Sequence, residues 1–357
     1  MKTAHTYIIA EIGINHNGSL ENCLAMVDAA ADAGCDCAKL QFFKASSLYP
    51  RSAGRLDWKD DKGAYDYDIY EAVESFEMPE EWLEPVVRRC EERGLDASAS
   101  VFDLPAVDYL LERGVRTLKL SSYTITHLPL IEYCASKKVP LVMSTGGATL
   151  AEVDEAVRTV LAHHSDLALL HCSIQYPTPL DKCNLGVIET YRKAYPDLRV
   201  GFSDHTAEPE NAPVQTVLLG GSVIEKHITL DKAMPGPDHF FALNPTELKR
   251  MVAAVRQAEK DAAQGNVAID AAMYGSSSRM VYEHERYLRE FCYMTLYVGR
   301  DIAMGEAIRP EDLRVLRSGK KQPGLEPKHL RLFHEHRVTA KRALRFEEPL
   351  GWDHILG

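Results

Sequence analysis

The stretch RVGFSDHTAEPENAPVQTVLLGGSVIEKH, residues 199–227, decides the predicted fold, because it contains a strand-like apolar run, an amphipathic helical segment and a second strand-like run. The same alternation extends from the start of the chain to about residue 262. Eight strand-like runs occupy residues 7–12, 37–43, 96–100, 117–121, 141–144, 168–172, 199–203 and 222–227. Strict alternation predicts a parallel sheet, and eight repeats predict a closed (β/α)8 TIM barrel.

An open, doubly wound sheet is the alternative fold. Such sheets usually carry a G-x-G-x-x-G turn after the first strand, and the residues found there, EIGINHNG at 11–18, do not match it. The barrel is therefore the preferred prediction. Residues 44–79 form a long connection rich in Asp, Tyr and Gly, which we interpret as a cover over an active site.

The sequence changes character after the last predicted barrel helix. We assign residues 1–265 to the barrel, 266–289 to a linker and 290–357 to a small β-rich domain. The last region has short apolar runs, turn signals at Met304-Gly305 and Pro323-Gly324, and no long helical pattern. A domain of this size has little core of its own, so we expect it to pack on a barrel or on a partner chain.

Composition narrows the classes of function. The chain has 357 residues, with 52 acidic and 41 basic side chains and a formal net charge of −11. This balance argues against nucleic-acid binding, which depends on Lys and Arg contacts to phosphates, but a few clustered lysines would still bind a small anion. We expect neither a signal peptide nor a membrane span. Eight scattered cysteines without a C-x-x-C pair indicate reduced thiols and a cytoplasmic location.

Polar residues close nearly every predicted strand, and barrel active sites lie at those ends. The candidates are Glu11, Lys39, Gln41, Ser100, Lys119, Ser122, Ser144, Thr145, His171, Ser203, His205, Lys226 and His227. His205 and His227 end neighbouring strands and are placed to face one metal ion, with open positions for substrate. The alternative is that each histidine only makes hydrogen bonds at the end of its strand.

Lys39 and Lys119 end the second and fourth strands. A lysine inside a barrel mouth needs an anion, so the pair indicates either a phosphate site or ion pairs with Glu11 or another carboxylate. Four serines would supply hydroxyl donors around the same anion: Ser100, Ser122, Ser144 and Ser203.

At these residues the sequence resembles the sialic acid synthase family, which comprises N-acetylneuraminate synthases and their pseudaminate and legionaminate relatives. The resemblance rests on IIAEIGINHNG at 8–18, KLQFFKASSL at 39–48, MSTGGATLAEVDEAV at 143–157, LLHCSIQYPTP at 169–179, GFSDHT at 201–206 and VIEKHITLDKAMPGPDH at 223–239. The tail VGRDIAMGEAIRPEDLRVLRSG at 298–319 resembles the antifreeze-like (SAF) domain that follows the barrel in this family.

The resemblance implies a transferase of carbohydrate biosynthesis, which condenses phosphoenolpyruvate with an open-chain amino sugar and releases phosphate. It implies a phosphoenolpyruvate site made of Lys39, Ser100, Lys119, Ser122, Ser144 and Ser203. It implies that His205 and His227 hold Mn²⁺ or Mg²⁺. It implies that the sugar or the reacting carbons are faced by four further residues, Glu11, Gln41, Tyr176 and Asp238. The resemblance also implies a homodimer with exchanged SAF domains, in which Arg317 reaches the partner's site.

One departure from the family pattern concerns the sugar. Family members usually carry a glutamate after the serine that ends the fourth strand, where this chain has Ser122-Tyr123-Thr124. Thr124 cannot act as a carboxylate, so we expect a divergent acceptor. Two other functions stay open: a catalytically silent barrel that serves as a scaffold or binding protein, and an aldolase that forms a Schiff base with pyruvate on Lys39 or Lys119.

Overall fold

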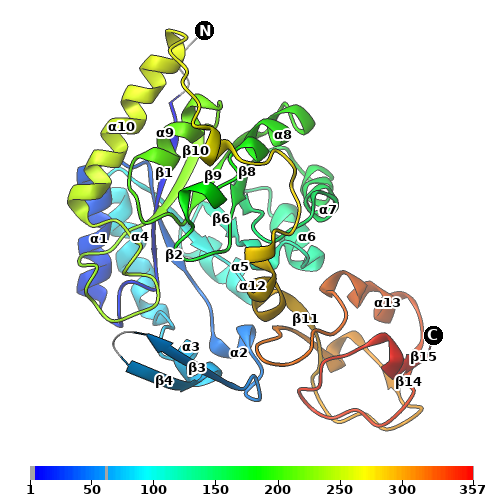
Figure 1. Cartoon of the computed structure of the whole chain (residues 1–357). Helices are drawn as coiled ribbons and strands as arrows, with labels where there is room; N and C mark the ends of the chain where they lie inside the picture. Colours follow the sequence, from blue (N-terminus) through cyan, green and yellow to red (C-terminus); the bar gives the residue numbers. More distant parts are fainter. Residues whose placement is uncertain (1–4, 61–62, 357) are drawn as a thin grey trace.

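Eight parallel strands close into a barrel in the computed structural model, which describes residues 5–60 and 63–356 (Figure 1). The strands are β1 (Tyr7–Gly13), β2 (Cys37–Gln41), β5 (Asp96–Ser100), β6 (Thr117–Leu120), β7 (Leu141–Ser144), β8 (Leu167–Cys172), β9 (Arg199–Asp204) and β10 (Val223–His227). The last strand pairs with the first, from Tyr7 opposite Val223 to Glu11 opposite His227. Closure confirms the predicted (β/α)8 barrel and excludes the open sheet.

Helices surround the strands (Figure 1). They are α1 (Leu20–Ala33), α4 (Leu83–Glu92), α5 (Leu104–Glu112), α6 (Leu128–Ser136), α7 (Leu150–Leu161), α8 (Gly186–Ala194), α9 (Asn211–Leu218) and α10 (Pro245–Ala263). Local sequence determines where they begin. Helix α7, for example, starts at a capping box in which Thr149 and Glu152 each accept the other's backbone N–H, an arrangement that contributes about 1 kcal/mol.

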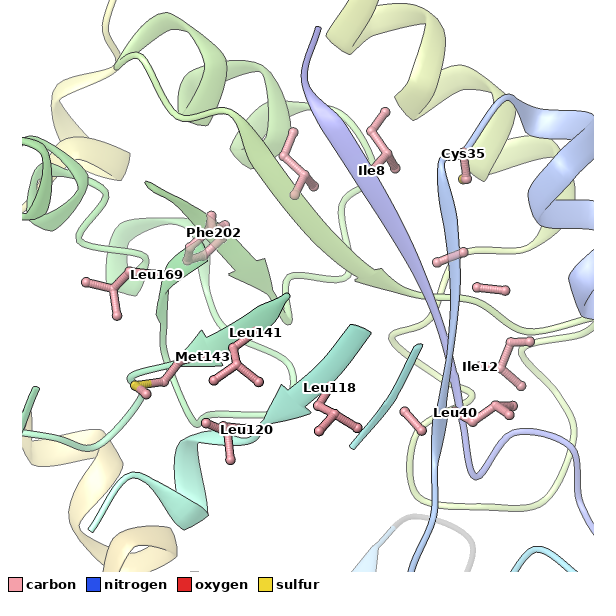
Figure 2. Packing of buried hydrophobic residues seen from close by; sticks show 14 of the residues in the cluster. Ile8, Ile12, Cys35, Leu40, Leu118, Leu120, Leu141, Met143, Leu169 and Phe202 are labelled. Carbon is pink, nitrogen blue, oxygen red and sulfur yellow. The ribbon is translucent and has the colours of Figure 1, made fainter. Parts of the chain in front are cut away.

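Apolar side chains on the outer face of the barrel pack beneath the helices. Figure 2 shows part of this cluster, including Ile8, Leu118, Leu141, Leu169 and Phe202. Successive side chains of a strand point to opposite faces, so the residues between these point into the barrel. The outer face therefore supplies most of the core and leaves the inner face for chemistry.

The inner face changes from apolar to polar along the strands. Its apolar layer contains Ile9, Cys37, Val142, Ala168, Leu170 and Val223. Two residues further along four of these strands lie Glu11, Lys39, Ser144 and Glu225. The polar layer thus occupies the C-terminal ends of the strands, where barrel enzymes have their active sites.

The connection after β2 folds over this end of the barrel. It contains α2 (Ala45–Leu48), a hairpin of β3 (Arg55–Asp60) and β4 (Gly63–Asp68), and α3 (Ile69–Glu74). Its apolar side chains form a cluster with residues that follow β1, β2 and β5, among them Ile14, Phe43 and Phe102. The connection therefore lies beside the mouth, and its role as a cover stays a prediction.

The C-terminal region forms small antiparallel sheets with a core of their own. Strand β11 (Met294–Val298) pairs with β13 (Leu313–Arg317), and β14 (Val338–Ala340) lies between β12 (Ala307–Ile308) and β15 (Ile355–Leu356). The core of this region includes Leu296, Val298, Ile308 and Leu350. A small β-rich region was expected here, whereas its identification as an SAF domain and the boundaries at 265 and 289 stay predictions.

These sheets contact the barrel of the same chain on the side of the strand ends (Figure 1). The backbone N–H groups of Arg51 and Ser52 donate to the Glu347 carboxylate at 2.9 and 3.0 Å, and Lys320 N–H donates to the Ala53 carbonyl at 3.0 Å. Met294 joins the apolar cluster of the connection after β2. None of the helices formed by the described residues has the length and hydropathy needed to cross a membrane.

Candidate active site

Four charged side chains form a buried cluster in the polar layer of the barrel. Lys39 Nζ lies 2.7 Å from Glu11 Oε2 and 3.7 Å from Glu225 Oε1. Lys119 Nζ lies 3.4 Å from the same Glu225 oxygen. Lys39 also donates a hydrogen bond to Ser100 Oγ at 3.1 Å. Two cations and two anions compensate one another, which permits their burial.

The sequence left open whether the two lysines bind an anion or pair with carboxylates. In the described residues both lysines have carboxylate partners, Glu11 and Glu225. An incoming phosphate would therefore share Lys39 and Lys119 with these carboxylates. The pairing holds both ammonium groups in place before any ligand arrives.

The cluster shifts the pKa values of its members in different directions. Burial raises the pKa of Glu11, and Glu225 raises it further, against the opposing effect of Lys39. Burial also acts to raise the pKa of Glu225, but Lys119 and Lys39 outweigh it and lower that pKa. Burial lowers the pKa of Lys119, whereas for Lys39 the carboxylates overcome burial and raise the pKa. Glu11 is thus the carboxyl group that most readily carries a proton.

Neutral polar groups surround the charged cluster. Ser203 Oγ donates to Glu225 Oε1 at 3.0 Å, and Gln41 Nε2 donates to Glu11 Oε1 at 2.8 Å. Ser144 Oγ is buried and makes no hydrogen bond with the described residues. A buried hydroxyl without a partner is unusual and matches a group that a ligand would satisfy.

His205 and His227 lie side by side, with ring centroids 5.5 Å apart. His205 Nδ1 donates to the Ser173 carbonyl at 2.8 Å, which leaves the lone pair on Nε2. His227 Nδ1 is buried without a hydrogen bond. Burial lowers the pKa of His205 to about 4; burial and then the nearby His205 lower the pKa of His227 well below its usual value. Both imidazoles are therefore neutral at pH 7, the form that binds metal ions.

The histidine pair fits a weakly held divalent ion. The imidazole of His205 is neutral and oriented by a hydrogen bond, and the imidazole of His227 has an unpartnered nitrogen, so both are suitable metal ligands. In the part of the chain that the structure describes, no group of three or more His, Cys, Asp or Glu side chains has the arrangement of a metal site. Two protein ligands leave positions for substrate and water.

Aromatic rings and one acid border the histidines. The Tyr176 ring lies 4.2 Å from that of His205, and the Phe241 ring lies 5.0 Å from that of His227. Asp238 Oδ2 lies 3.7 Å from His227 Nδ1, and the Asp238 side chain is 19% exposed. Burial, followed by the charge of Glu11, raises the pKa of Asp238 to about 7. This acid can exchange a proton near neutral pH.

Arg317 reaches the mouth from strand β13 of the same chain. Its guanidinium carbon lies 5.1 Å from the ring centre of Tyr123, 5.3 Å from Phe102 and 5.6 Å from Tyr49. Its Nε is buried without a hydrogen bond. Tyr123 links it to the site, because Tyr123 Oη donates to Tyr176 Oη at 3.2 Å. Arg317 thus packs against aromatic residues of its own barrel. Its predicted reach into a partner's site stays a prediction.

The region of the missing glutamate is filled by Tyr123 and Thr124. Thr124 Oγ1 donates to the Ser121 carbonyl at 2.9 Å, so its hydroxyl serves the local turn. Tyr123 supplies a phenol at the edge of the mouth instead. This wall of the mouth is aromatic where the family pattern would place a carboxylate.

Sequence reasoning misplaced two strand-end residues and missed one. Lys226 does not line the mouth; its Nζ lies 2.7 Å from Asp204 Oδ2 in a buried pair on the other face of β10. His171 does not line the mouth either, because its Nε2 donates to the Cys183 carbonyl at 2.8 Å. Glu225, which the sequence analysis did not select, lies at the centre of the cluster. Counting two residues back from His227 would have found it.

Comparison with known proteins identifies similar chains. A sequence model described as the NeuB family matches residues 26–267. The chain is 39% identical to the spore coat polysaccharide biosynthesis protein SpsE of Bacillus subtilis, over 99% of this chain and 95% of that protein. The crystal structure of SpsE superposes with a TM-score of 0.88 at 38% identity, covering 100% of this chain and 96% of the other.

Two further relatives carry the names of enzymes. The chain is 33% identical to the N,N'-diacetyllegionaminic acid synthase of Legionella pneumophila, over 98% of this chain and 94% of that protein. It is 32% identical to a pseudaminic acid synthase of Campylobacter jejuni, over 90% of this chain and 89% of that protein.

Proposed function

This chain belongs to the NeuB family, and from that membership we propose that it is a nonulosonic (sialic-type) acid synthase. It condenses phosphoenolpyruvate with an amino sugar and releases phosphate, which makes it a transferase of carbohydrate biosynthesis. The observation that carries the proposal is the placement of two neutral histidines at the same barrel mouth as two buried lysines. The relatives do not favour the silent scaffold or the Schiff-base aldolase.

Phosphoenolpyruvate binds, in this proposal, on the lysine side of the mouth. Lys39 and Lys119 meet its phosphate and carboxylate, with hydroxyl groups from Ser100, Ser122, Ser144 and Ser203. The unpartnered Ser144 hydroxyl and the Lys39–Ser100 hydrogen bond support this assignment. The added negative charge raises the pKa of Glu11 further, which makes its carboxylate a stronger base.

His205 and His227 would hold Mn²⁺ or Mg²⁺ on the opposite side of the mouth. Such an ion supplies Lewis acidity to the aldehyde oxygen of the open-chain sugar. The chain contributes the orientation, because the Ser173 carbonyl fixes the ring of His205. The rings of Tyr176 and Phe241 pack against the histidines and limit the access of water.

The remaining chemistry is proton transfer. The enol carbon of phosphoenolpyruvate attacks the aldehyde carbon, and water adds to the carbon that bears the phosphate. The bond from that carbon to the phosphate oxygen then breaks, the added hydroxyl becomes the keto group, and the hydroxyl proton leaves with the phosphate. Glu11, oriented by Gln41, accepts a proton from the water. Asp238 donates a proton to the former aldehyde oxygen, for which a pKa of about 7 is suited.

The acceptor is an N-acetylmannosamine-like or related amino sugar. Tyr123, Tyr176 and Arg317 border its place, and Thr124 supplies no carboxylate. A sugar that does not need this carboxylate as a hydrogen-bond acceptor explains the change. We further propose a homodimer with exchanged SAF domains, and a cytoplasmic location that suits its eight buried thiols.

The direct test supplies phosphoenolpyruvate, Mn²⁺ and a panel of N-acylated aldoses, and measures phosphate release. Release with one or more amino sugars is expected, and silence across the panel contradicts the proposal. Borohydride with pyruvate should trap no imine on the wild-type chain. An imine on Lys39 or Lys119 would instead identify an aldolase.

A further inference from the structure

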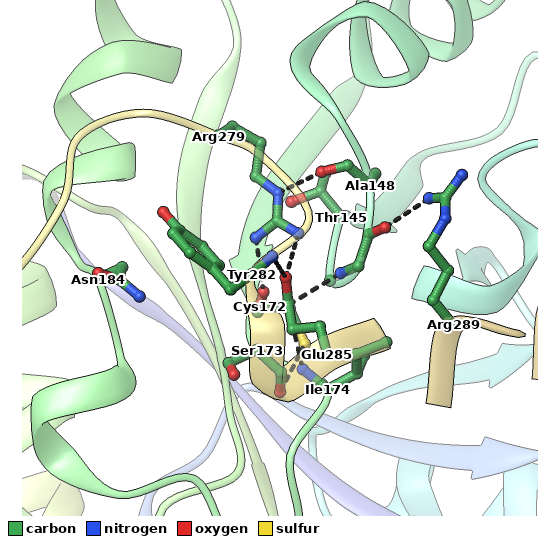
Figure 3. A network of polar contacts seen from close by, with 12 residues as sticks. Thr145, Ala148, Cys172, Ser173, Ile174, Asn184, Arg279, Tyr282, Glu285 and Arg289 are labelled. Carbon is green, nitrogen blue, oxygen red and sulfur yellow. Dashed lines mark hydrogen bonds and ion pairs between the residues drawn. The ribbon is translucent and has the colours of Figure 1, made fainter. Parts of the chain in front are cut away.

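A buried ion pair lies in the segment between the barrel and the small sheets. Arg279 Nη2 lies 2.8 Å from Glu285 Oε2, and both side chains are 0% exposed (Figure 3). Glu285 belongs to a 3₁₀ turn, η4 (Glu283–Glu285), and Arg279 to an irregular stretch before it. The sequence predicts only a linker at 266–289, yet these two side chains bind the backbone at the barrel mouth.

Both side chains hold the loop that follows β7. Glu285 Oε1 accepts the N–H of Gly147 at 2.9 Å, and Arg279 Nε donates to the Ala148 carbonyl at 2.7 Å (Figure 3). Gly147 has φ +68°, and a Cβ there would lie 2.6 Å from Ile174 Cδ1. The loop is therefore tightly packed, Gly147 suits its positive φ, and the two side chains of the linker bind its backbone.

The same pair holds the end of β8. Arg279 Nη1 donates to the Cys172 carbonyl at 3.4 Å, and Glu285 Oε1 accepts the N–H of Ile174 at 3.4 Å. Between these two residues lies Ser173, whose carbonyl orients His205. The ion pair is thus hydrogen-bonded to the backbone on both sides of that carbonyl.

The two segments lead directly to proposed site residues. The loop after β7 begins beside Ser144, and Gly146 N–H donates to Ser122 Oγ at 2.9 Å. We propose that Arg279 and Glu285 are positioning residues of the active site, which set the serine hydroxyls on the phosphoenolpyruvate side and the His205 ring on the metal side together.

This inference rests on the proposed function for the identity of the two ligands. Its physical basis is that charge-assisted hydrogen bonds between buried groups hold backbone groups more firmly than neutral ones. A linker side chain that only anchored the chain would not need to bridge two catalytic loops. The pair therefore makes the segment after the barrel a part of the site.

The test uses Glu285→Gln in the full chain, and measures binding without turnover. Mn²⁺ binding is followed by electron paramagnetic resonance, and phosphoenolpyruvate binding by calorimetry. Loss of an outer-shell partner costs on the order of 10–100-fold in metal affinity, and we expect both affinities to fall by that amount.

A matched control is Glu259→Gln. Glu259 also pairs with an arginine, Arg256, at 2.7 Å and accepts the backbone N–H of Thr6, but it lies at the opposite end of the barrel. Its substitution is expected to lower the melting temperature without changing either affinity. A second variant, Arg279→Lys, keeps the charge beside Glu285 and loses donors to the two carbonyls, so an intermediate loss is expected.

The outcomes separate this inference from the proposed function. A wild-type chain that binds neither Mn²⁺ nor phosphoenolpyruvate overturns both. A wild-type chain that binds them, with Glu285→Gln and Arg279→Lys binding equally well, overturns the positioning role alone. If neither variant folds while Glu259→Gln does, the pair is structural and the positioning role is likewise overturned.

Discussion

Glu11 and Glu225 share one buried cluster, but their surroundings shift their pKa values in opposite directions. Glu225 lies between two lysines and accepts a hydrogen bond from Ser203, so it stays ionised. Glu11 faces a single lysine within 3 Å and the amide of Gln41. The division resembles other sites in which two carboxyl groups take different roles, one as a fixed charge and one as a proton carrier.

The proton-transfer role proposed for Glu11 predicts the result of Glu11→Gln. The amide keeps the size of the side chain but cannot accept a proton, so kcat should fall on the order of 100- to 10,000-fold. The pH profile of kcat/KM should also lose the ionisation that lies above the usual range for glutamate. Steady-state kinetics from pH 5 to 9 measures both. Glu132→Gln, on the exposed face of α6, is the control, and a kcat within tenfold of wild type in Glu11→Gln contradicts the role.

His205 and His227 predict a metal requirement. Treatment with EDTA should abolish phosphate release, and Mn²⁺ should restore it in the wild type. The variants His205→Ala and His227→Ala should neither bind Mn²⁺ nor release phosphate. After EDTA treatment, their melting temperatures should differ little from that of the wild type, because both histidines lie at strand ends beyond the apolar layer. Mn²⁺ binding and melting curves are the measurements. Turnover retained by both variants would refute the metal assignment.

Among the secondary-structure elements, α6 begins at an unusual N-cap. His127 Nδ1 accepts the N–H of Leu130 at 3.3 Å, and burial lowers the pKa of His127 to about 3. An unfolded chain takes up this proton near pH 6.5, whereas the folded chain does not. The free energy of unfolding therefore falls with pH below 6.5, by about 1.4 kcal/mol per unit, until the folded pKa is reached.

Replacing His127 by Asn should remove this sensitivity. The amide oxygen of Asn caps a helix at any pH. Between pH 8 and pH 4.5, His127→Asn should gain about 3 kcal/mol relative to wild type. Urea unfolding at the two pH values measures this difference, with the exposed His336→Asn as control. His171 is also buried and has a pKa lowered to about 3, so the variant retains part of the acid sensitivity. A wild-type-like pH dependence in His127→Asn would contradict the assignment.

Element periodicity explains which site residues could be predicted. The eight strands and the polar ends of most of them follow from sequence, because a buried parallel strand needs an apolar run and its end opens on solvent. Lys226 shows the limit: at a strand end, adjacent residues such as Glu225 and Lys226 take opposite faces, and only the register decides which one lines the mouth.

Contacts through the backbone could not be predicted at all. Arg279 and Glu285 bind carbonyl and N–H groups of the loop after β7 and the end of β8, and every residue offers such groups. No motif marks the pairing, so residues 266–289 were predicted as a linker. Family resemblance alone supplied the roles proposed for Tyr176, Asp238 and Arg317, which composition and periodicity did not indicate.

In a dimer, the small C-terminal domain of each chain can serve its own barrel or the barrel of its partner. Within one chain, the N–H groups of Arg51 and Ser52 hold Glu347, and Arg317 packs on Tyr49. Exchange of the domain between two chains would preserve the same contacts, because a swapped interface repeats the interface within one chain. The sequence-based prediction of an exchanged homodimer therefore concerns which chain supplies the domain, and not how the domain contacts the barrel.

Mixed chains distinguish the two connectivities. If the proposed roles hold, His205→Ala disables the barrel and Arg317→Ala disables the small domain, so each variant chain alone should be inactive. After co-expression, an exchanged mixed dimer holds one site with both native residues, and random pairing predicts about a quarter of the wild-type activity per site. If each domain serves its own barrel, no site is complete and the mixture stays inactive. Phosphate release from the co-purified chains is the measurement, and activity no greater than the sum of the separate variants would refute the exchange.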